Sequence, residues 1–477
     1  MENTYNTVPY PTYAQVQTHP DHLATIATLL GLKPAPARAC RVLEIGCGTA
    51  DNLIAMAHGL PESEFVGIDL ASEPIQEGRR VTAALGLRNI DLRAMDLMDT
   101  GPELGIFDYI VAVGVFGWVP ELVRQQMLSL CSSQLSPHGV AFISYNCYPG
   151  FHLRAIVRDL LRYHTAGIED PKRVLAQSFA VMKFMVELQS EERDEYDNCL
   201  RAELTKSLAR EPGGLFHDEL EKDSIAFYFS DVVGMAREHG LQYLGEAEFF
   251  MMQTHLRGDK VEAAMKDLAG DVVRREQYLD FLHGRRYRQT LFCRQEAQIQ
   301  REAKAESMRS LYFSSPARLD KEGKYRRATG VPVKPVHPLA LAALERLTSF
   351  WPKRVSFPEL LAACGAGEEK TADLCQILMG CYSAGIIDAH MDAPHFVRNA
   401  GERPVLSPLA RLQLADDEIT PNLCHALVRI PDEKCRHMAQ LLDGSRDRAT
   451  LARELNITEE TVENYLTELG GMALMLA

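Results

Sequence analysis

A short apolar segment that runs into two closely spaced glycines places the strongest constraint on the fold of this chain. Residues 41–45 read Arg-Val-Leu-Glu-Ile, and Gly46 and Gly48 come next along the chain. A short apolar run bounded by glycine is typical of a buried strand. Because glycine has no Cβ atom, Gly46 and Gly48 can take positive φ and let the backbone approach a ligand closely. The sequence therefore predicts a buried strand that breaks into a ligand-binding turn.

The residues after this turn indicate which ligand it takes. The segment Gly-Cys-Gly-Thr-Ala-Asp-Asn lacks the third glycine of a dinucleotide-binding turn, so a phosphate cradle is the weaker interpretation. The next predicted strand ends in Asp69, whose carboxylate could accept hydrogen bonds from both hydroxyls of a ribose. A third ends near Asp96, between Met95 and Leu97, where a carboxylate could bind an adenine amino group. These carboxylates predict a nucleoside pocket without a phosphate site.

The composition is that of a soluble protein with several domains. The chain has 477 residues, which exceeds one ordinary core, and 46% of them are hydrophobic and 24% charged. The net charge of -14 argues against a general binder of nucleic acid or anionic membranes. No apolar run reaches the roughly 18 to 20 residues that span a bilayer, and the first residues show no secretory signal. We expect a cytoplasmic protein that binds neither nucleic acid nor membrane.

The cysteines point to the same compartment. Eleven are present, and none stands in a Cys-x-x-Cys pair or in a paired Cys/His spacing typical of metal sites. Thiols stay unpaired where the cell keeps them reduced. We therefore expect free thiols, a bacterial-type cytoplasmic location and no metal site.

Strand-like and helical stretches alternate over the first third of the chain. The apolar, strand-like runs lie at 41–45, 65–69, 90–95, 107–113 and 139–145. Their alternation with helical stretches predicts a parallel sheet with crossover helices. Ligands of such sheets bind at the carboxyl ends of the strands, where the carboxylates named above fall.

Residues 1–40 form a separate N-terminal part. They begin with a Tyr/Pro-rich arm, and Thr18-His-Pro-Asp21 follows as a helix start. The helix carries Leu23, Ile26, Leu29 and Leu30 at helical spacing. We expect the arm to lie over the ligand.

Two loops follow the fourth and fifth predicted strands and border the place where a second substrate would enter. Their aromatic and polar side chains belong to Phe116, Trp118, Tyr145, Asn146 and Tyr148. Aromatic faces attract a cation, and the polar atoms could orient a nitrogen, so the group would suit an amine. A turn with packed aromatic side chains is the alternative interpretation.

With these motifs the sequence resembles a known family, the class I S-adenosylmethionine-dependent methyltransferases. The residues that match the family's cofactor motifs in order and spacing are Glu44, Gly46, Gly48, Asp69 and Asp96. The resemblance implies an α/β, Rossmann-like domain that binds S-adenosyl-L-methionine, forms S-adenosyl-L-homocysteine and needs no metal. It implies further cofactor contacts at Tyr13, Thr18, His19, Cys47, Asn52, Leu70, Gln76, Met95, Leu97, Val113 and Gly114. The amine site would then receive the methyl acceptor, with catalytic residues Phe116, Trp118, Tyr145, Asn146 and Tyr148.

Longer segments narrow the resemblance to bacterial methyltransferases with a so-called regulatory domain, a group that includes rickettsial outer-membrane-protein lysine methyltransferases. The matching segments are at 10–24, 114–120, 145–150, 227–229 and 239–248. The resemblance implies a protein-lysine N-methyltransferase. It also implies four parts: an arm and helix over the cofactor (1–40), the methyltransferase domain (41–165), a mostly helical middle or regulatory domain (166–330) and a winged-helix-like C-terminal region (331–477).

Two other functions stay open. At Val113, Phe116 and Gly117 the chain has no polar side chain where the related enzymes carry one, often histidine at the first position. This departure favours a methyltransferase that acts on a small molecule or a biosynthetic peptide. A third possibility is a regulatory protein that binds the cofactor without catalysis.

The segment 274–327 is basic in an otherwise acidic chain. It holds 14 Lys/Arg against 7 Asp/Glu, with its densest cluster at Arg285, Arg286 and Arg288. A basic surface of this kind could dock a protein or peptide substrate. Pairing with acidic residues of the same chain is the alternative. The sequence does not decide between a monomer and a homodimer.

The C-terminal region is predicted to form winged-helix-like modules. Ser356 and Glu359 fit a capping box, and a helix from Thr371 stops at Gly385 before a strand-like segment at 386–390. A second helix-turn-helix pattern runs from Leu451–Leu455 into 458–466. The would-be recognition helices are poor in Lys and Arg, and the second begins with glutamates, which phosphates repel. We therefore interpret the modules as protein-contact or substrate-positioning domains.

Overall fold

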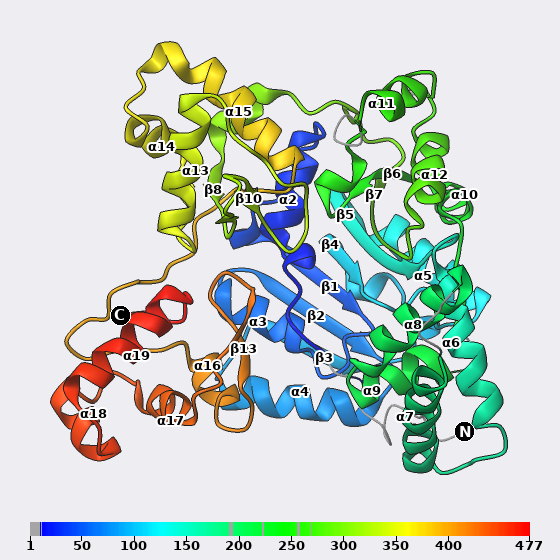
Figure 1. The fold of residues 1–477 in the computed structure, drawn as a ribbon, viewed down its shortest axis with the longest axis horizontal. Helices are drawn as coiled ribbons and strands as arrows, with labels where there is room; N and C mark the ends of the chain where they lie inside the picture. The colour runs from blue at the N-terminus through cyan, green and yellow to red at the C-terminus, as the bar shows by residue number, and fades with distance from the viewer. Residues whose placement is uncertain (1–9, 11, 190–193, 222–223, 255–257, 269) are drawn as a thin grey trace.

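A seven-stranded sheet forms the centre of the molecule in a computed structural model of the chain (Figure 1). The structure describes residue 10 and residues 12–189, 194–221, 224–254, 258–268 and 270–477. The strand order in the sheet is β3-β2-β1-β4-β5-β7-β6. The first residues of the predicted arm, 1–9, and Pro11 lie outside the described residues.

The first five strands are parallel and agree with the predicted strands to within a few residues. They are β1 (Arg41–Ile45), β2 (Glu64–Asp69), β3 (Ile90–Ala94), β4 (Phe107–Ala112) and β5 (Leu135–Asn146). The predicted parallel sheet is thereby confirmed. In register, Glu44 on β1 lies opposite Gly67 on β2 and Val111 on β4, so the carboxyl ends of these strands meet at one edge.

Two further strands extend the sheet beyond β5, and the sequence analysis does not predict them. β7 (Tyr287–Arg294) runs antiparallel to β5, and β6 (Leu241–Glu246) runs antiparallel to β7. Both belong to the region 166–330 that is expected to be mostly helical, so the sheet crosses the predicted domain boundary at 165. A local apolar pattern cannot reveal a pairing between segments so far apart in the chain.

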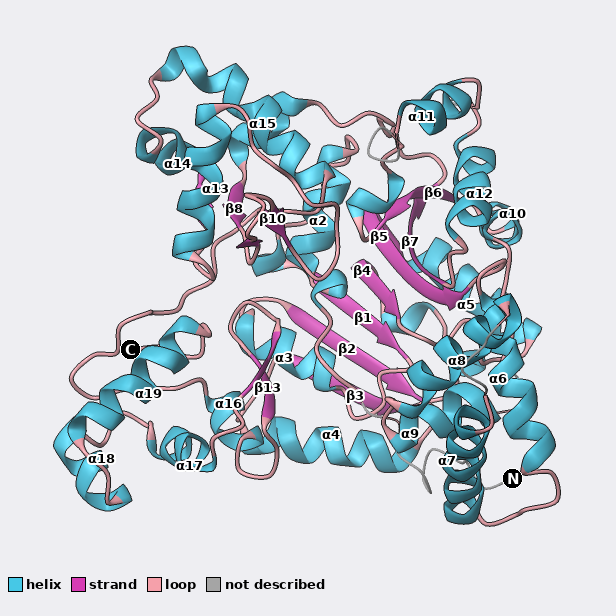
Figure 2. Ribbon diagram, in the orientation of Figure 1, coloured by secondary structure: helices cyan, strands magenta, loops and turns pink. Residues whose placement is uncertain are grey.

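Helices cover both faces of this sheet (Figure 2). One face packs against α2 (Pro20–Leu29), α3 (Asp51–Gly59) and α4 (Ser72–Ala84). The other face packs against α5 (Glu121–Gln134) and α10 (Phe229–Glu238), with α12 (Val272–His283) against α10. Successive strand residues point to opposite faces, so Val42 and Leu43 enter different cores. The helix predicted after Thr18 is confirmed as α2, although His19 caps it.

A small helical subdomain follows β5. Its elements are α6 (Phe151–His164), α7 (Pro171–Glu187), α8 (Glu195–Leu208), α9 (Pro212–Leu215) and the π-helical turn η5 (Phe216–Leu220). It has a core of its own that includes Val157, Leu161, Met182, Leu204 and Leu215. The chain then returns to the sheet through α10.

The first C-terminal unit combines three helices with a three-stranded sheet. The helices are α13 (Pro338–Phe350), α14 (Phe357–Ala363) and α15 (Thr371–Ser383), and the strand order is β11-β8-β12. The central strand β8 (Tyr312–Ser314) precedes the predicted boundary at 330, whereas β11 (Val355–Ser356) and β12 (Asp388–His390) follow it. The predicted capping box of Ser356 and Glu359 is confirmed at the start of α14.

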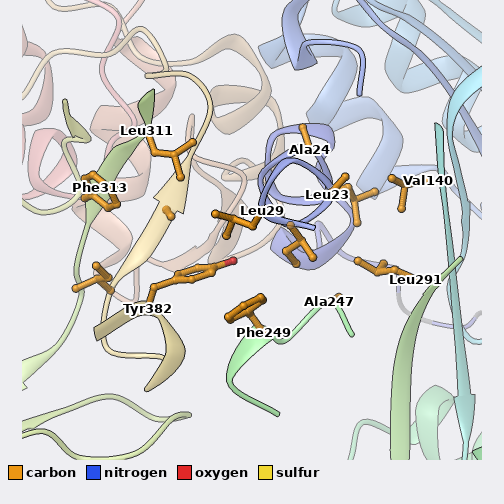
Figure 3. Packing of buried hydrophobic residues seen from close by; sticks show 14 of the residues in the cluster. Leu23, Ala24, Leu29, Val140, Ala247, Phe249, Leu291, Leu311, Phe313 and Tyr382 are labelled. Carbon is orange, nitrogen blue, oxygen red and sulfur yellow. The ribbon is translucent and has the colours of Figure 1, made fainter. Parts of the chain in front are cut away.

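Helix α2 lies between the central sheet and this C-terminal unit (Figure 3). Leu23 faces Val140 and Leu291 of the sheet, while Phe313 of β8 and Tyr382 of α15 lie on the opposite side of the helix. All five side chains are buried. The sheet, α2 and the first C-terminal unit therefore share one hydrophobic core.

A second C-terminal unit has its own core, which includes Leu406, Met438, Leu451 and Val462. It contains α16 (Pro408–Gln413), the hairpin β13 (Ile419–Pro421) and β14 (Leu427–Arg429), α17 (Glu433–Leu441), α18 (Arg448–Leu455) and α19 (Glu459–Gly471). Helices α18 and α19 confirm the second helix-turn-helix pattern.

Shorter elements connect these parts. They are η1 (Val16–Thr18), η2 (Ala37–Ala39), η3 (Leu97–Asp99), η4 (Pro102–Leu104), η6 (Phe249–Met252), α11 (Asp259–Lys266), η8 (Ala305–Ser310), β9 (Arg318–Leu319), β10 (Tyr325–Arg326) and η9 (Glu368–Lys370). All eleven cysteines are free thiols, as expected from the sequence. Across the described ranges, no helix combines the length and apolar character needed to cross a membrane.

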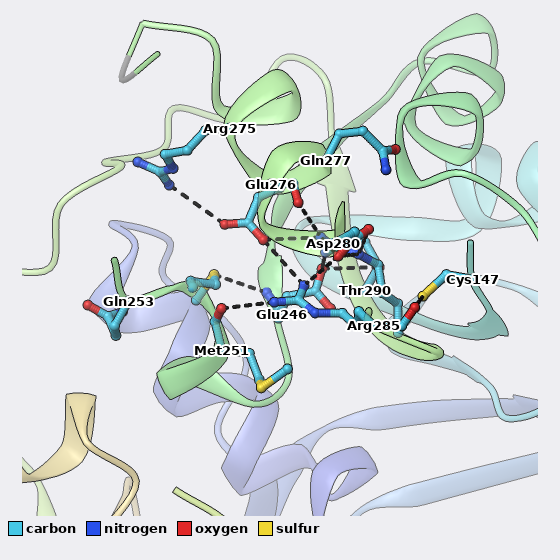
Figure 4. Close-up of polar contacts among 12 residues, drawn as sticks. Cys147, Glu246, Met251, Gln253, Arg275, Glu276, Gln277, Asp280, Arg285 and Thr290 are labelled. Carbon is cyan, nitrogen blue, oxygen red and sulfur yellow. Dashed lines mark hydrogen bonds and ion pairs between the residues drawn. The ribbon is translucent and has the colours of Figure 1, made fainter. Parts of the chain in front are cut away.

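The densest basic cluster of the sequence is paired inside the molecule, and Figure 4 shows one of its members, Arg285, beside Glu276 and Asp280. Arg288 is fully buried and bridges the carboxylates of Glu246, Glu276 and Asp280, with its guanidinium 3.9 Å above the ring of Phe229. Its neighbours follow the same pattern, since Arg285 pairs with Glu276 and Asp280 and Arg286 pairs with Glu203. For this cluster the alternative of intramolecular pairing holds, so these three arginines do not form an open docking surface.

Candidate active site

The carboxylates predicted to bind a nucleoside lie along the carboxyl edge of the parallel strands. Glu44 is the penultimate residue of β1, Asp69 ends β2, and Asp96 follows β3 by two residues. Val113 and Gly114 follow β4 at the same edge. The strand order places them side by side, in agreement with the rule that ligands of such sheets bind at the carboxyl ends.

The glycine turn after β1 has the predicted backbone conformation. Gly46 and Gly48 have φ of 70° and 56°, in the left-handed region that favours glycine. A Cβ atom on Gly46 would lie 2.4 Å from Val115 Cγ2, so this position has no room for a side chain. The carboxylate of Asp69 accepts hydrogen bonds from the N–H groups of Gly48 and Ala71, both at 2.8 Å. Asp69 therefore fixes the turn to the end of β2.

Glu44 carries the clearest sign of where a ligand group would bind. Its side chain is buried, and Oε1 accepts a hydrogen bond from Asn52 Nδ2 at 2.9 Å. Oε2 is buried too, yet it has no hydrogen-bond partner among the described residues. Burial raises the pKa of Glu44 to about 7, against the opposing hydrogen bond from Asn52, and the charges of Asp51 and Asp69 raise it further. A ligand that brings an ammonium group would satisfy the oxygen and restore the charged carboxylate.

The remaining predicted cofactor residues differ in how far their side chains are exposed at this edge. Asp96, Met95 and Val113 are half-buried at the edge, while Gly114, Leu70, Gln76 and Tyr13 are exposed. Asp96 accepts a hydrogen bond from Met98 N at 2.9 Å. The side chains of Cys47, Leu97, Thr18 and Asn52 are buried, and His19 is partly so. Such buried side chains support the turn and its surroundings from within.

The arm before α2 lies against the glycine turn. The Thr12 hydroxyl hydrogen-bonds the side chains of Thr49 and Asp51. A Cβ atom added to Gly48 would come within 2.9 Å of Thr12 Cγ2, so the arm approaches the turn closely. Further along, Gln15 N donates a hydrogen bond to Asn52 Oδ1 at 2.9 Å.

Of the five residues expected at the acceptor site, two are part of the core. Phe116 and Tyr145 are buried, their rings lie 6.1 Å apart, and the Tyr145 hydroxyl shares a hydrogen bond with Thr290 at 3.0 Å. This packing matches the alternative interpretation of these two side chains. Trp118 is half-buried, and Gly117 is closed off because a Cβ atom there would lie 2.7 Å from Ile225 O.

The other two expected acceptor residues lie at the end of β5 and just beyond it. The ring of Tyr148 is half-buried and stacks on His152 at 4.3 Å between centroids. Asn146 Oδ1 accepts a weak hydrogen bond from Arg154 Nη1 at 3.4 Å. Asn146 and Tyr148 thus remain together at the carboxyl edge of the sheet, while Phe116 and Tyr145 pack behind them.

The structure adds residues that the sequence analysis misses. Arg154 on α6 reaches beyond Asn146 to Glu219 Oε1 at 2.8 Å and to Asp218 Oδ2 at 3.2 Å. The Tyr10 hydroxyl lies 3.5 Å from Asp218 Oδ1. Tyr10, Asp218 and Glu219 are therefore linked to the end of β5 through Arg154. Tyr10 belongs to the segment 10–24 that carries the family resemblance, but no motif marks its contact with Asp218, because the arm and the turn η5 are far apart in the chain.

This edge has the chemistry of a site for a nucleoside and an amine. Carboxylates lie at or just beyond the ends of three adjacent strands, the glycine turn admits close contact, and the half-buried ring of Tyr148 lies just beyond Asn146. Asp218 and Glu219 are paired with Arg154 and Arg210. Within the described part of the chain, no group of three or more His, Cys, Asp and Glu side chains is arranged to hold a metal ion.

Comparison with known families identifies three parts of the chain. Residues 42–139 match the model of a methyltransferase domain, and residues 211–294 match that of a predicted methyltransferase regulatory domain. Residues 402–469 match the C-terminal winged helix domain of the PKMT proteins. The regulatory match covers β6 and β7, which complete the central sheet.

Two relatives are uncharacterized proteins of Rickettsia prowazekii. One is 36% identical over 299 residues, which are 63% of this chain and 54% of that protein, so this chain spans about half the length of that relative. The other is 31% identical over 241 residues, which are 50% of this chain and 96% of that protein. Among solved structures, PKMT2 from Rickettsia typhi, also determined with AdoHcy, is 23% identical with a TM-score of 0.87 and covers 98% of this chain and 100% of its own.

The sheet order, the glycine turn and the carboxylates at the strand ends define a class I methyltransferase domain. The chain belongs to the S-adenosylmethionine-dependent methyltransferases of the rickettsial PKMT type, with a regulatory domain and a C-terminal winged helix domain.

Proposed function

We propose that this protein transfers methyl groups from S-adenosylmethionine to lysine side chains of a protein substrate. One observation carries the choice of acceptor: Asn146 and the half-buried ring of Tyr148, which stacks on His152 at 4.3 Å, lie together at the sheet edge that holds the cofactor motifs. An amide oxygen beside an aromatic face suits an amine acceptor. The similarity in fold to PKMT2, a protein lysine methyltransferase, supports the same acceptor class.

The residues at the strand ends fit the cofactor. The unpartnered Oε2 of Glu44 suits the ammonium of its methionine part, Asp69 suits the ribose hydroxyls, and Asp96 suits the adenine amino group. The arm, through Thr12 and Tyr13, would cover the bound cofactor. When bound, the cofactor supplies a methyl group that is attached to a positively charged sulfur. The bond between this sulfur and the methyl carbon breaks as the acceptor nitrogen forms a bond to the same carbon.

The chain's own residues must align the acceptor and free its lone pair. A lysine with the ordinary pKa of about 10.4 is only about 0.1% neutral at pH 7.4. In our proposal Asn146 orients the nitrogen and the face of Tyr148 shields it from water, so that the lysine reacts as the neutral amine after its proton has passed to the solvent. Holding the two reacting groups in line can lower the barrier by about 7–11 kcal/mol.

The competing acceptor, a small molecule or a biosynthetic peptide, loses part of its support. It rests on the missing polar side chains at Val113, Phe116 and Gly117. Gly117 has a structural reason, since the backbone of Ile225 pairs with it at 2.8 Å and leaves no room for a side chain. Phe116 likewise packs in the core.

The free thiols suit a reducing compartment, and we place the protein in the bacterial cytoplasm.

The test is a transfer assay with S-adenosylmethionine labelled in its methyl group. The purified protein is incubated with a soluble lysate of a source strain that lacks it, and the products are separated into macromolecular and small-molecule fractions. Base-stable label in protein bands, located on lysine by mass spectrometry, supports the proposal. Label confined to small molecules moves the acceptor to a metabolite or peptide, and binding without any transfer refutes catalysis.

A matched control separates enzymatic transfer from contamination. The Asp69→Ala variant removes the carboxylate that holds Gly48 and is expected to contact the ribose, and it should label nothing. The Arg38→Ala variant changes only an exposed ion pair with Asp392 and should label the same bands as the unmodified protein.

A further inference from the structure

The hairpin of the second C-terminal unit presents a histidine to the methyltransferase domain. His425 lies in the turn between β13 and β14, with φ of 63° and only 4% of its surface exposed. Its Nε2 lies 2.9 Å from Asn52 Oδ1, on the first turn of α3. Its ring centroid lies 5.1 Å from that of His19, the cap of α2.

The turn that carries His425 is held firmly by its own unit. Asn422 Oδ1 accepts hydrogen bonds from Cys424 N and Ala426 N, both at 2.9 Å, and Asn422 Nδ2 donates to Met472 O at 2.9 Å. Leu423 N donates to Ala473 O at 3.0 Å. A left-handed residue other than glycine persists only where its surroundings fix it. The hairpin therefore positions His425 rigidly rather than leaving it to adapt.

Asn52 connects three distant parts of the chain. Its Oδ1 accepts from Gln15 N of the arm at 2.9 Å and faces His425 Nε2, while its Nδ2 donates to Glu44 Oε1 at 2.9 Å. The two ends of an asparagine amide have nearly the same shape, so their donors and acceptors decide which way it points. Because Gln15 N can only donate, Oδ1 faces the arm, and His425 Nε2 must carry its proton and donate as well.

Glu44 depends on this orientation. With the Asn52 N–H directed at Oε1, the carboxylate is held so that Oε2 stays buried and without a protein partner. If the Asn52 amide were turned the other way, its Oδ1 would face Glu44 Oε1. The two oxygens would then repel each other unless the Glu44 carboxylate took up a proton. The donor on His425 disfavours that arrangement.

We infer that His425 is a positioning residue of the cofactor site, by which the C-terminal winged helix unit sets Asn52 and thereby prepares Glu44 to receive the ammonium of S-adenosylmethionine. The C-terminal unit is then a working part of the methyltransferase centre. The inference rests on the proposed function only in taking S-adenosylmethionine as the ligand at Glu44. It does not depend on the nature of the acceptor.

Cofactor affinity, measured without any acceptor, tests this inference. The dissociation constants of S-adenosylmethionine and S-adenosylhomocysteine are determined by calorimetry for the full chain and for His425→Ala, His425→Gly and His425→Gln. Loss of one buried hydrogen bond should weaken binding about 5- to 10-fold in the alanine and glycine variants. His425→Gln can present an amide N–H near the place of Nε2 and should recover most of the affinity.

The glycine variant separates positioning from stability. Glycine relieves the left-handed strain at φ of 63°, so His425→Gly should unfold at a higher temperature than His425→Ala while it binds the cofactor equally weakly. His395→Ala, an exposed histidine of the C-terminal region, should leave the affinity unchanged.

Three results would overturn the inference. Unchanged cofactor affinity in folded His425→Ala and His425→Gly would exclude a positioning role. Affinity that follows the unfolding temperature across the three variants would make His425 a packing residue only. If the unmodified chain binds neither S-adenosylmethionine nor its product, the proposed function fails together with the inference, whereas binding without methyl transfer refutes only the proposed function.

Discussion

The guanidinium of Arg354 lies 2.8 Å from the carboxylate of Asp21, although 333 residues separate the two in the chain. Both side chains are almost fully buried. The same carboxylate accepts hydrogen bonds from Met391 N at 2.8 Å and Asp392 N at 3.0 Å, and it lies 3.0 Å from His390 Nδ1. One residue in the first turn of α2 thus holds the first C-terminal unit against the N-terminal helix.

Removing Arg354 should destabilise the protein strongly. Arg354→Ala leaves a buried carboxylate without its counter-charge, and we expect the free energy of unfolding to fall by about 3–5 kcal/mol. Chemical denaturation measures this loss. The control is Arg38→Ala, whose guanidinium is 72% exposed and 3.7 Å from Asp392, and which should cost at most about 1 kcal/mol. Similar losses in both variants would contradict the role given to Asp21.

The buried histidines should lower the stability as the pH drops below neutrality, whereas the raised pKa of Glu44 acts in the opposite direction. Burial lowers the pKa of His19 to about 4; Asp21 opposes this shift, and Arg354 adds to it. The pKa values of His390 and His425 are lowered too, mainly by burial. Unfolded histidines take up protons near pH 6.5, so between about pH 6.5 and pH 4 the unfolded chain binds more protons at these histidines, and their contribution to stability decreases with decreasing pH. Between pH 7 and pH 5, His19 alone should account for about 2 kcal/mol.

The His19→Asn variant checks this source of the pH dependence. Asparagine is a good helix cap and does not titrate, so the variant should keep α2 and show a shallower loss of stability between pH 7 and pH 5. Denaturation curves at both pH values give the difference. The same slope in both proteins would show that His19 does not titrate as described.

The Gly46→Ala substitution should disrupt the cofactor-binding turn. The added Cβ atom would lie 2.4 Å from Val115 Cγ2 at a backbone φ of 70°. Strain and overpacking together predict a loss of about 2–5 kcal/mol in stability and of measurable cofactor binding. Gly86→Ala is the matched variant, because Gly86 has φ of 66° but nothing within 4 Å of its Cβ position. It should lose only about 1–2 kcal/mol and bind the cofactor normally.

Asn146 should affect the acceptor and not the cofactor. Asn146→Ala removes the amide proposed to orient the nitrogen, and kcat/KM for the acceptor should fall about 10- to 100-fold. The dissociation constant of S-adenosylmethionine should stay within about twofold of the unmodified value. Steady-state kinetics and calorimetry measure the two quantities. A larger loss in cofactor affinity than in turnover would place Asn146 in the nucleoside pocket instead.

The sequence was sufficient to predict that the three carboxylates share one edge of the sheet. Glu44, Asp69 and Asp96 each lie at or just beyond the end of an apolar run of strand length, and parallel strands bring such ends together whatever lies between them. The cofactor half of the site therefore depends on local patterns. The acceptor residues Phe116 and Tyr145 were harder to place, because a strand-end position does not reveal that both rings pack in the core.

The remaining features depend on contacts between distant segments. Nothing near Arg288 in the chain reveals that Glu246 and Asp280 surround it, so a basic run in sequence became a buried ion network. Tyr10 and His425 likewise reach the site from outside the central domain. Strands β6 and β7 were hidden for the same reason, since their pairing partners lie far away in sequence.

The position of α2 between the sheet and the first C-terminal unit also affects folding while the chain is being synthesised. A ribosome releases Leu23 well before Phe313, which covers the other side of the same helix. At roughly 5–20 residues per second, these 290 residues (313 minus 23) take about 15–60 s. Throughout that interval one apolar side of the nascent helix lacks its final cover, and exposed apolar surface of this kind makes a growing chain prone to aggregation.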